Sequence, residues 1–157
     1  MKGDDLRVTN PEKYIQCMTG HRCWICGNAN KKEKVFITDI QSALTGNSVE
    51  PPGHMDCTIY ALKVCPYLLL PKTKRRSAAL EVYVEEDSPA LNEKNPGIFV
   101  MTSVKKFKFE KIPGNERYKW ARWEEKNILS QSLWSEGATL DTNSKGKLDH
   151  ALLIGHL

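Results

Sequence analysis

Four residues have the types and the spacing to hold one metal ion, namely Cys23, Cys26, His54 and Cys57. Cys23 and Cys26 form a C-x-x-C pair followed directly by Gly27, so a tight turn can bring both thiolates to one ion at about 2.3 Å. His54 and Cys57 stand three positions apart where a helix is expected to begin, which places them on the same side of its first turn. Three sulfurs and one nitrogen are a closed tetrahedral set, as in structural zinc sites. The sequence therefore predicts one structural zinc ion.

Two other kinds of chemistry use some of these residues. A lone C-x-x-C can be a redox pair, but that pair occurs in a βαβ context that this sequence does not offer. A catalytic zinc ion needs an open coordination position, and four protein ligands leave none for water. If His54 were not a ligand, that position would be free, so the role of His54 separates a structural site from a catalytic one.

The other cysteines are predicted to be buried thiols. Cys65 follows Cys57 by eight residues, which is about 12 Å along a regular helix and too far for both to bind one ion. Cys17 and Cys65 are therefore expected to pack as small hydrophobic side chains. The odd total of five cysteines, without an export signal, argues against a disulfide framework.

No catalytic residues are expected. His150 and His156 lie in the C-terminal tail without a paired nucleophile, and no glycine-rich phosphate loop is present. Zinc-dependent HNH nucleases also use a treble clef, but they need a histidine pair near the strand and helix. His54 is already assigned to zinc, and His21 could serve only if the fold brought it across. An enzyme and a small-molecule substrate are accordingly not predicted.

Periodicity and breaker residues predict an α+β protein. Asn10 and Pro11 suit a helix start, and Pro66 suits a helix end. Helices are expected over 10–18, 54–65, 124–135 and 148–157, and strands over 35–37, 80–85, 97–102, 107–112 and 118–120. The C-x-x-C-G turn at Cys23–Gly27, which we call the knuckle, is followed by a strand and then by the helix that carries His54 and Cys57. This is the order of a treble-clef zinc finger. We thus expect a treble-clef-like zinc module over residues 1–70, packed with an α+β half over 71–157 that contains a small antiparallel sheet, as one compact unit.

Composition narrows the class of protein. A length of 157 residues and 40% hydrophobic content suit one folded domain. No run approaches the ~20 apolar residues of a membrane helix, and the charged start Met1–Asp5 is unlike a secretory signal, so a soluble, cytoplasmic protein is expected. The net charge of +4 permits nucleic-acid binding without requiring it.

Two regions could form a binding surface. The basic run Lys72–Arg76 could contact phosphates or be a solvated linker, and Lys105–Phe109 could bind a single strand or be a strand with its phenylalanines inward. Tryptophans and arginines close together are enriched at interfaces, and at least one exposed indole is expected among Trp120, Trp123 and Trp134. The candidate surface residues are Lys72, Lys74, Arg75, Arg76, Arg117, Trp120, Arg122 and Trp123.

The motifs Cys23-Trp24-x-Cys26-Gly27, Glu50-Pro51-Pro52-x-His54-x-Asp56-Cys57 and Cys65-Pro66-Tyr67-Leu68 resemble a family of small phage and bacterial proteins without an established activity. Similarity extends to Arg7–Pro11, Asn95–Ile98, Glu116-Arg117 and the 124–137 segment. Between the metal motifs, family members carry Gly-Pro-Met-Cys and an Asn-Arg pair, where this chain has Thr38–Ser42 and Thr45-Gly46. The resemblance implies a phage or mobile-element origin and supplies no reaction.

Three function hypotheses follow. The first is a non-enzymatic, zinc-stabilised binding protein that acts on nucleic acid or on proteins that handle it. The second is a protein inhibitor of a host defence or replication enzyme, which acts by occlusion through the tryptophan-rich region. The third is an HNH-like nuclease. Salt dependence separates the first two, because a phosphate contact weakens steeply with salt and a tryptophan-anchored interface does not.

Overall fold

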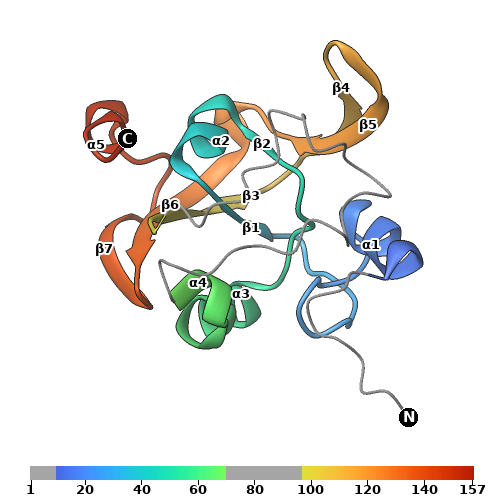
Figure 1. Ribbon diagram of the computed structural model, residues 1–157, viewed down its shortest axis with the longest axis horizontal. Coiled ribbons are helices and arrows are strands. Elements are labelled where there is room, and N and C mark those ends of the chain that lie inside the picture. Colours follow the sequence, from blue (N-terminus) through green and yellow to red (C-terminus); the bar gives the residue numbers. More distant parts are fainter. Residues whose placement is uncertain (1–9, 70–96) are drawn as a thin grey trace.

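The computed structural model describes residues 10–69 and 97–157, which combine helices with two antiparallel sheets (Figure 1). The α+β class is thereby confirmed. The elements are, in chain order, α1 (Pro11–Met18), β1 (Lys34–Thr38), α2 (Ile40–Thr45), β2 (Asn47–Ser48), α3 (Met55–Val64), α4 (Pro66–Leu69), β3 (Phe99–Val104), β4 (Lys108–Ile112), β5 (Asn115–Arg122), the 3-10 turn η2 (Glu125–Asn127), β6 (Ile128–Ser135), β7 (Ala138–Asn143) and α5 (His150–Ile154).

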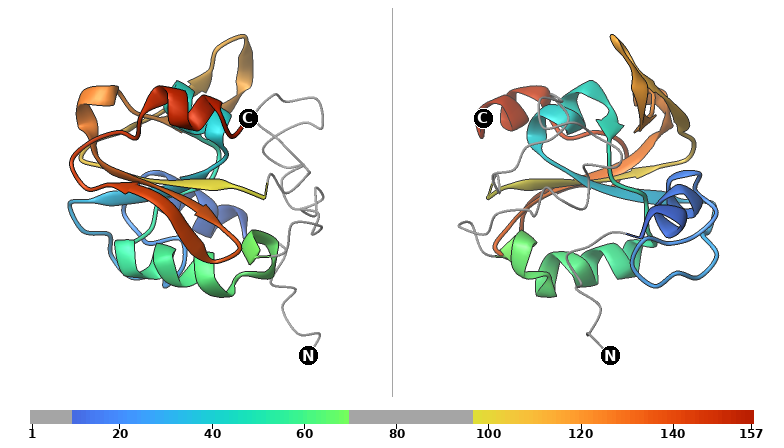
Figure 2. Two further views of the ribbon diagram at one scale, coloured as in Figure 1. Left: turned by 90° about the vertical axis from the view of Figure 1, so that its left-hand side faces the viewer. Right: turned by 45° about the vertical axis from the view of Figure 1, so that its right-hand side comes forward.

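The larger sheet has the strand order β1-β3-β6-β7, and all its neighbours are antiparallel. Every residue of β3 is buried, because helices cover both faces of the sheet. Figure 2 shows α3 and α4 on one side of this sheet and α2 and α5 on the other. Burial on both faces accounts for the apolar run Phe99–Met101 that begins β3, and the buried Thr102 and Ser103 follow it.

Each face of the larger sheet has its own apolar cluster. On the side of α3 and α4, Leu62 packs with Phe99, Met101 and Trp134. On the side of α2 and α5, the buried members are Ile40, Ala43, Val100, Leu133, Leu148 and Leu153. Alternation along β3 sends Phe99 and Met101 to one layer and Val100 to the other, as the two-residue period of a strand requires.

The smaller sheet, with the order β2-β5-β4, encloses a third cluster together with α1. Phe36 of β1 lies at its centre and stacks on Trp123, with ring centroids 4.8 Å apart. Tyr14 and Met18 of α1 complete the cluster, and the Tyr14 hydroxyl donates to the carbonyl oxygen of Val49. This packing ties α1 to the chain just before the second pair of metal-ligand candidates.

Both sheets join strands from the two parts of the sequence that lie on either side of residue 70. Strand β1 pairs with β3, and β2 pairs with β5. The strand expected over 80–85 and the basic run Lys72–Arg76 lie outside the described residues. Within the described ranges, no helix has both the length and the apolar character needed to cross a membrane.

The prediction of a helix over 124–135 is wrong, since this segment forms η2 and then strand β6. Its apolar residues recur at helical spacing, but β6 lies between β3 and β7 and obtains its backbone hydrogen bonds from both. Leu133 and Trp134 then enter the two opposite core layers. Tertiary strand pairing has outweighed a local pattern that favoured helix.

Helix α2 was not expected from the sequence. Its N-cap is Asp39, whose carboxylate accepts from the Ser42 amide at 2.7 Å. Gly46 ends the helix in the left-handed region at φ +74, and its carbonyl oxygen accepts from the Trp123 amide at 2.9 Å. The predicted helices over 10–18, 54–65 and 148–157 and the predicted strands within the described residues are confirmed, with shifted ends.

We predict that Gly46→Ala destabilises the fold by at least about 2 kcal/mol, because it forces a side chain into the left-handed region and against backbone. A Cβ at Gly46 would lie 2.7 Å from the Trp123 carbonyl oxygen. Gly114→Ala is the matched control, since Gly114 has φ +78 and a Cβ there meets nothing within 4 Å. Urea unfolding measures both variants, and equal losses of stability would contradict the proposed contact.

Candidate metal centre

The first ligand pair lies on a knuckle closed by its own backbone. Arg22 and Ala29 form an antiparallel bridge, and the Cys23 amide donates to the Asn28 carbonyl oxygen at 2.8 Å. The Gly27 amide donates back to Cys23 at 2.9 Å, with Gly27 at φ +76. The turn therefore places Cys23 inside and Cys26 at the surface, on the same side of the loop.

The second pair reaches the knuckle through strand β1. Val35 and Gly53 exchange two backbone hydrogen bonds, of 3.1 and 2.9 Å, and the Trp24 amide donates to the Pro52 carbonyl oxygen at 3.1 Å. Helix α3 begins directly afterwards, with His54 as its N-cap. The order of knuckle, antiparallel pairing and helix start is that of a treble clef.

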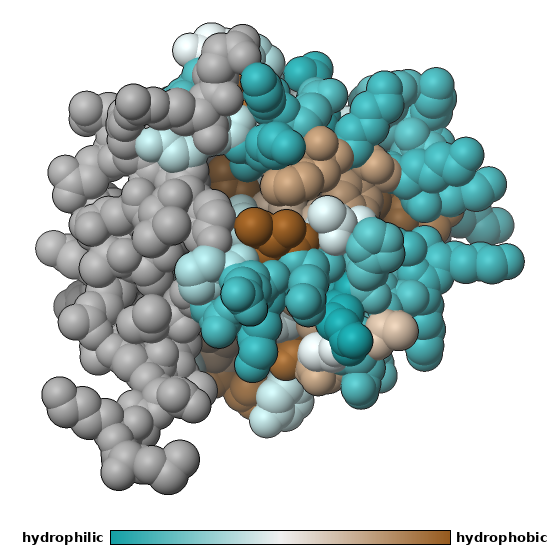
Figure 3. Space-filling model, turned by 90° about the vertical axis from the view of Figure 1, so that its right-hand side faces the viewer, coloured by the Kyte–Doolittle hydropathy of each residue, from teal (hydrophilic) through white to brown (hydrophobic). Residues whose placement is uncertain are grey.

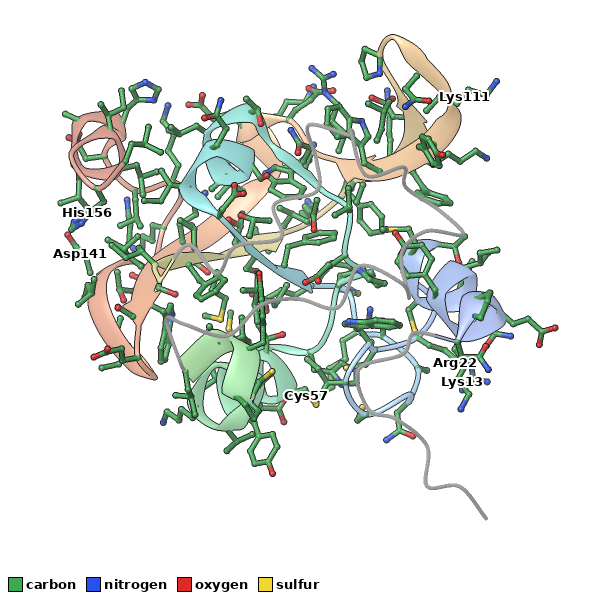
Figure 4. The ribbon with its side chains drawn as sticks, in the orientation of Figure 1. Lys13, Arg22, Cys57, Lys111, Asp141 and His156 are labelled. Atoms are coloured by element: carbon green, nitrogen blue, oxygen red, sulfur yellow. The ribbon has the colours of Figure 1, made fainter. Side chains whose placement is uncertain are left out.

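The ligand atoms of Cys23, Cys26, His54 and Cys57 all lie within 4.8 Å of one another. The Nδ1 atom of His54 is 3.4 Å from the Cys26 sulfur and 3.7 Å from the Cys57 sulfur. Figure 4 labels Cys57, which lies in the first turn of α3, between that helix and the knuckle. The structure thus brings together the four residues expected from the sequence, in a cluster that could hold a metal ion.

The imidazole of His54 has the orientation expected of a metal ligand. Its Nε2 atom lies 2.9 Å from the Ala29 carbonyl oxygen, so the tautomer with the proton on Nε2 donates to that oxygen and leaves the Nδ1 lone pair facing the sulfurs. A metal-bound histidine usually donates its second ring nitrogen to a carbonyl or carboxylate in this way. Ala29 belongs to the knuckle, so the same loop supplies two sulfurs and orients the nitrogen.

The environment of the cluster shifts the pKa values of its thiols in opposite directions. Burial acts to raise the pKa of Cys23, but backbone hydrogen bonds from Cys26, His54 and Ile25 outweigh it and lower that pKa to about 7. Burial and the neighbouring Cys26 and Cys23 sulfurs raise the pKa of Cys57 to about 12. A second thiolate is unfavourable beside the first, and a divalent cation between them would reverse this effect.

Cys17 and Cys65 lie outside the cluster. Cys17 is buried, and burial together with the nearby Cys23 thiol raises its pKa, which keeps it a neutral packing group. Cys65 is half-buried at the far end of α3. His21 is exposed, and its Nδ1 atom lies 2.9 Å from the Thr19 hydroxyl. In the part of the chain that the structure describes, no other group of His, Cys, Asp and Glu side chains converges in this way.

The predicted binding surface is only partly at the surface. Arg122 is exposed and lies 3.9 Å from a Glu110 oxygen, while Trp120 is half-buried. Trp123 is only 4% exposed and does not belong to a binding surface, because its ring is stacked on Phe36 in the core. Lys72, Lys74, Arg75, Arg76 and the side chain of Arg117 lie outside the described residues.

Gly53 is a feature of the site that the sequence analysis missed. A Cβ on Gly53 would lie 3.3 Å from the Cys23 sulfur, 3.2 Å from the Thr58 hydroxyl and 3.0 Å from Ile25. The absence of a side chain therefore lets the backbone pass close behind the first ligand. The signal in the sequence was a glycine directly before the histidine ligand, in a segment otherwise rich in proline.

No protein-family model, no curated protein and no solved structure matches this chain. The resemblance to small phage and bacterial proteins therefore stays a prediction.

We predict that Cys57→Ala abolishes stoichiometric metal binding and that Cys65→Ala preserves it. Both cysteines belong to α3 or its cap, but only Cys57 faces the other ligands. The measurement is metal content per chain after purification and dialysis, together with the far-UV circular dichroism of each variant. Equal metal content in the two variants would contradict the assignment of Cys57 as a ligand.

Proposed function

We propose that this chain is a non-enzymatic, zinc-stabilised protein that binds nucleic acid. The observation that carries the zinc part is the Cys3His cluster in which His54 faces two sulfurs with Nδ1 and the Ala29 carbonyl with Nε2. Three thiolates and one imidazole are a donor set that suits zinc. Four protein ligands also fill its tetrahedral coordination, which supports a structural ion rather than a catalytic one.

The distances in the cluster fit this ion. Bonds of about 2.3 Å to sulfur and about 2.0 Å to nitrogen place the two ligand types about 3.5 Å apart in a tetrahedron. The separations of the Cys26 and Cys57 sulfurs from His54 Nδ1, 3.4 and 3.7 Å, lie on either side of that value. Small rotations of the cysteine side chains would complete the set.

Zinc would supply folding free energy at this site. The Val35–Gly53 bridge and the Trp24–Pro52 hydrogen bond are the backbone contacts that hold the knuckle beside the start of α3 in the described structure. An ion bound to Cys23, Cys26, His54 and Cys57 adds four bonds across the same junction. The residues themselves would bind and orient the ion, and no reaction step is assigned to it.

The surface supports phosphate binding better than occlusion of a host enzyme. Inhibition through the tryptophan-rich region needs exposed indoles, but Trp123 and Trp134 are 4% and 6% exposed. The excess of 23 basic over 19 acidic residues is compatible with a polyanionic partner. A nuclease role is not favoured, because His54 is oriented toward the sulfurs and His21 is bonded to Thr19. A phage origin and a cytoplasmic location remain part of the proposal.

We expect one zinc ion per chain in protein purified without added metal, and loss of both zinc and folded signal in His54→Ala. His156→Ala is the matched control, since His156 is exposed near the C-terminus. Elemental analysis and circular dichroism provide the two measurements. Full zinc retention in His54→Ala would mean that this imidazole is free, and it would reopen the case for chemistry at the ion.

We also expect the wild-type protein to bind a mixed-sequence duplex of about 20 base pairs at low salt, with an affinity that falls steeply as salt rises. Each neutralised phosphate releases counterions and adds about 0.9 to the slope of log affinity against log salt. Fluorescence anisotropy over a salt series measures this slope. Absence of binding at low salt, in zinc-loaded and folded protein, would refute the nucleic-acid part of the proposal.

A further inference from the structure

Two lysine-bearing segments that are far apart in the sequence meet at one end of the larger sheet. Strands β1 and β3 are antiparallel, and Lys34, the first residue of β1, is paired with Val104, the last residue of β3. The turn that leads into β1 contains Lys31 and Lys32, and the segment that leaves β3 begins with Lys105 and Lys106. We call Lys31, Lys32, Lys105 and Lys106 the lysine cluster.

Within the described residues, no acidic side chain forms an ion pair with the lysine cluster. All four lysine side chains are exposed. Glu33, directly after Lys32, accepts a hydrogen bond from the Ser103 hydroxyl, and its single negative charge offsets only part of the charge of the four lysines. The Lys34 ammonium group donates to the Lys32 carbonyl oxygen at 3.2 Å and adds a further positive charge beside the cluster.

The nearest acids on the neighbouring elements already have cationic partners. Glu124, before η2, lies 2.7 Å from Lys126, and Glu110 of β4 lies 3.9 Å from Arg122. Figure 3, which views the side of the molecule that carries α1 and the β4–β5 hairpin, shows hydrophilic side chains around an apolar area in the middle of the coloured face. The lysine cluster therefore forms a site of net positive charge that a polyanion would neutralise.

The aromatic residues beside the lysine cluster are used inside the protein. Phe107 meets Phe36 edge to face at 5.2 Å, and a Cβ on Gly20 would lie 3.0 Å from its ring. The Lys119 ammonium lies 5.5 Å from the centre of the Phe109 ring. Both rings are half-buried against the core. This arrangement agrees with inward phenylalanines, and it provides no free stacking platform of the kind that single-strand binders use.

We infer that the lysine cluster binds the phosphate backbone of double-stranded nucleic acid without recognising bases. This inference rests on the proposed function and names the site and the form of its partner. Lysine ammonium groups are point charges that contact phosphates irrespective of sequence. A duplex is favoured because it presents one negative charge per about 1.7 Å of its axis, a higher density than a single strand offers.

The metal centre stabilises the turn on which half of this cluster lies. Asn30, directly before Lys31, donates its amide to the His21 carbonyl oxygen at 3.0 Å and its side-chain nitrogen to Arg22 at 3.4 Å. Both partners belong to the knuckle that carries Cys23. Loss of the ion would therefore loosen one of the two lysine turns, and we expect chelation to weaken binding.

The test compares two double variants that lose the same charge. The first combines Lys31→Gln with Lys105→Gln and removes two lysines of the cluster. The second, the control, combines Lys63→Gln with Lys145→Gln. Lys63 and Lys145 are exposed and lie on α3 and after β7. Each variant is titrated with a duplex of about 20 base pairs, a second duplex of unrelated sequence and a matching single strand, over a salt series. Zinc content and circular dichroism establish that the variants are folded.

We expect the first variant to lose at least about tenfold in affinity near 100 mM salt and to lower the salt slope by about 2, because two phosphate contacts are gone. The control should change affinity by less than about twofold and keep the slope. Equal losses in both variants, with wild-type binding intact, would overturn the site while leaving the proposed function standing. Tighter binding to the single strand, or a strong preference between the duplexes, would overturn backbone-only duplex recognition. No wild-type binding would refute the proposed function itself.

Discussion

The antiparallel pairing of Val35 with Gly53 is the contact on which the rest of this structure depends. It joins the first strand of the larger sheet to the segment that starts α3, and it therefore brings His54 and Cys57 to the knuckle. The pairing requires a close approach, since any Cβ on Gly53 would crowd Cys23, Ile25 and Thr58. One small residue thus allows both the sheet and the ligand cluster to form.

The same strand links the metal centre to the hydrophobic core. Alternation along β1 sends Val35 toward α3 and Phe36 toward α1 and Trp123, so neighbouring residues enter opposite apolar clusters. A shift of the knuckle would consequently disturb the packing of the apolar clusters on both faces of the larger sheet. An ion bound by the cluster would therefore contribute to the stability of the whole fold.

The proposed mode of binding rests on where the fold places aromatic and basic residues. The fold uses Trp123, Trp134 and the two phenylalanines of the β4 region for packing, and it leaves lysines at the surface. Interfaces anchored by desolvated aromatic rings and interfaces built on phosphate charges differ in their salt dependence. The buried rings and exposed lysines of this chain support the second kind, in line with the proposed phosphate partner.

The sequence alone determined the ligand set, because the C-x-x-C-G and H-x-x-C spacings dictate which side chains can reach one ion. It also determined α1, α3 and the strands whose caps, breakers and alternation are local.

Three features required the tertiary structure. Segment 128–135 has a helical pattern of apolar residues but became a strand, since β3 and β7 supply its hydrogen bonds. Trp123 became a core residue through its contact with Phe36. Lys31 and Lys105 came together only because β1 and β3 are antiparallel, and no local pattern encodes the pairing of strands that are more than sixty residues apart.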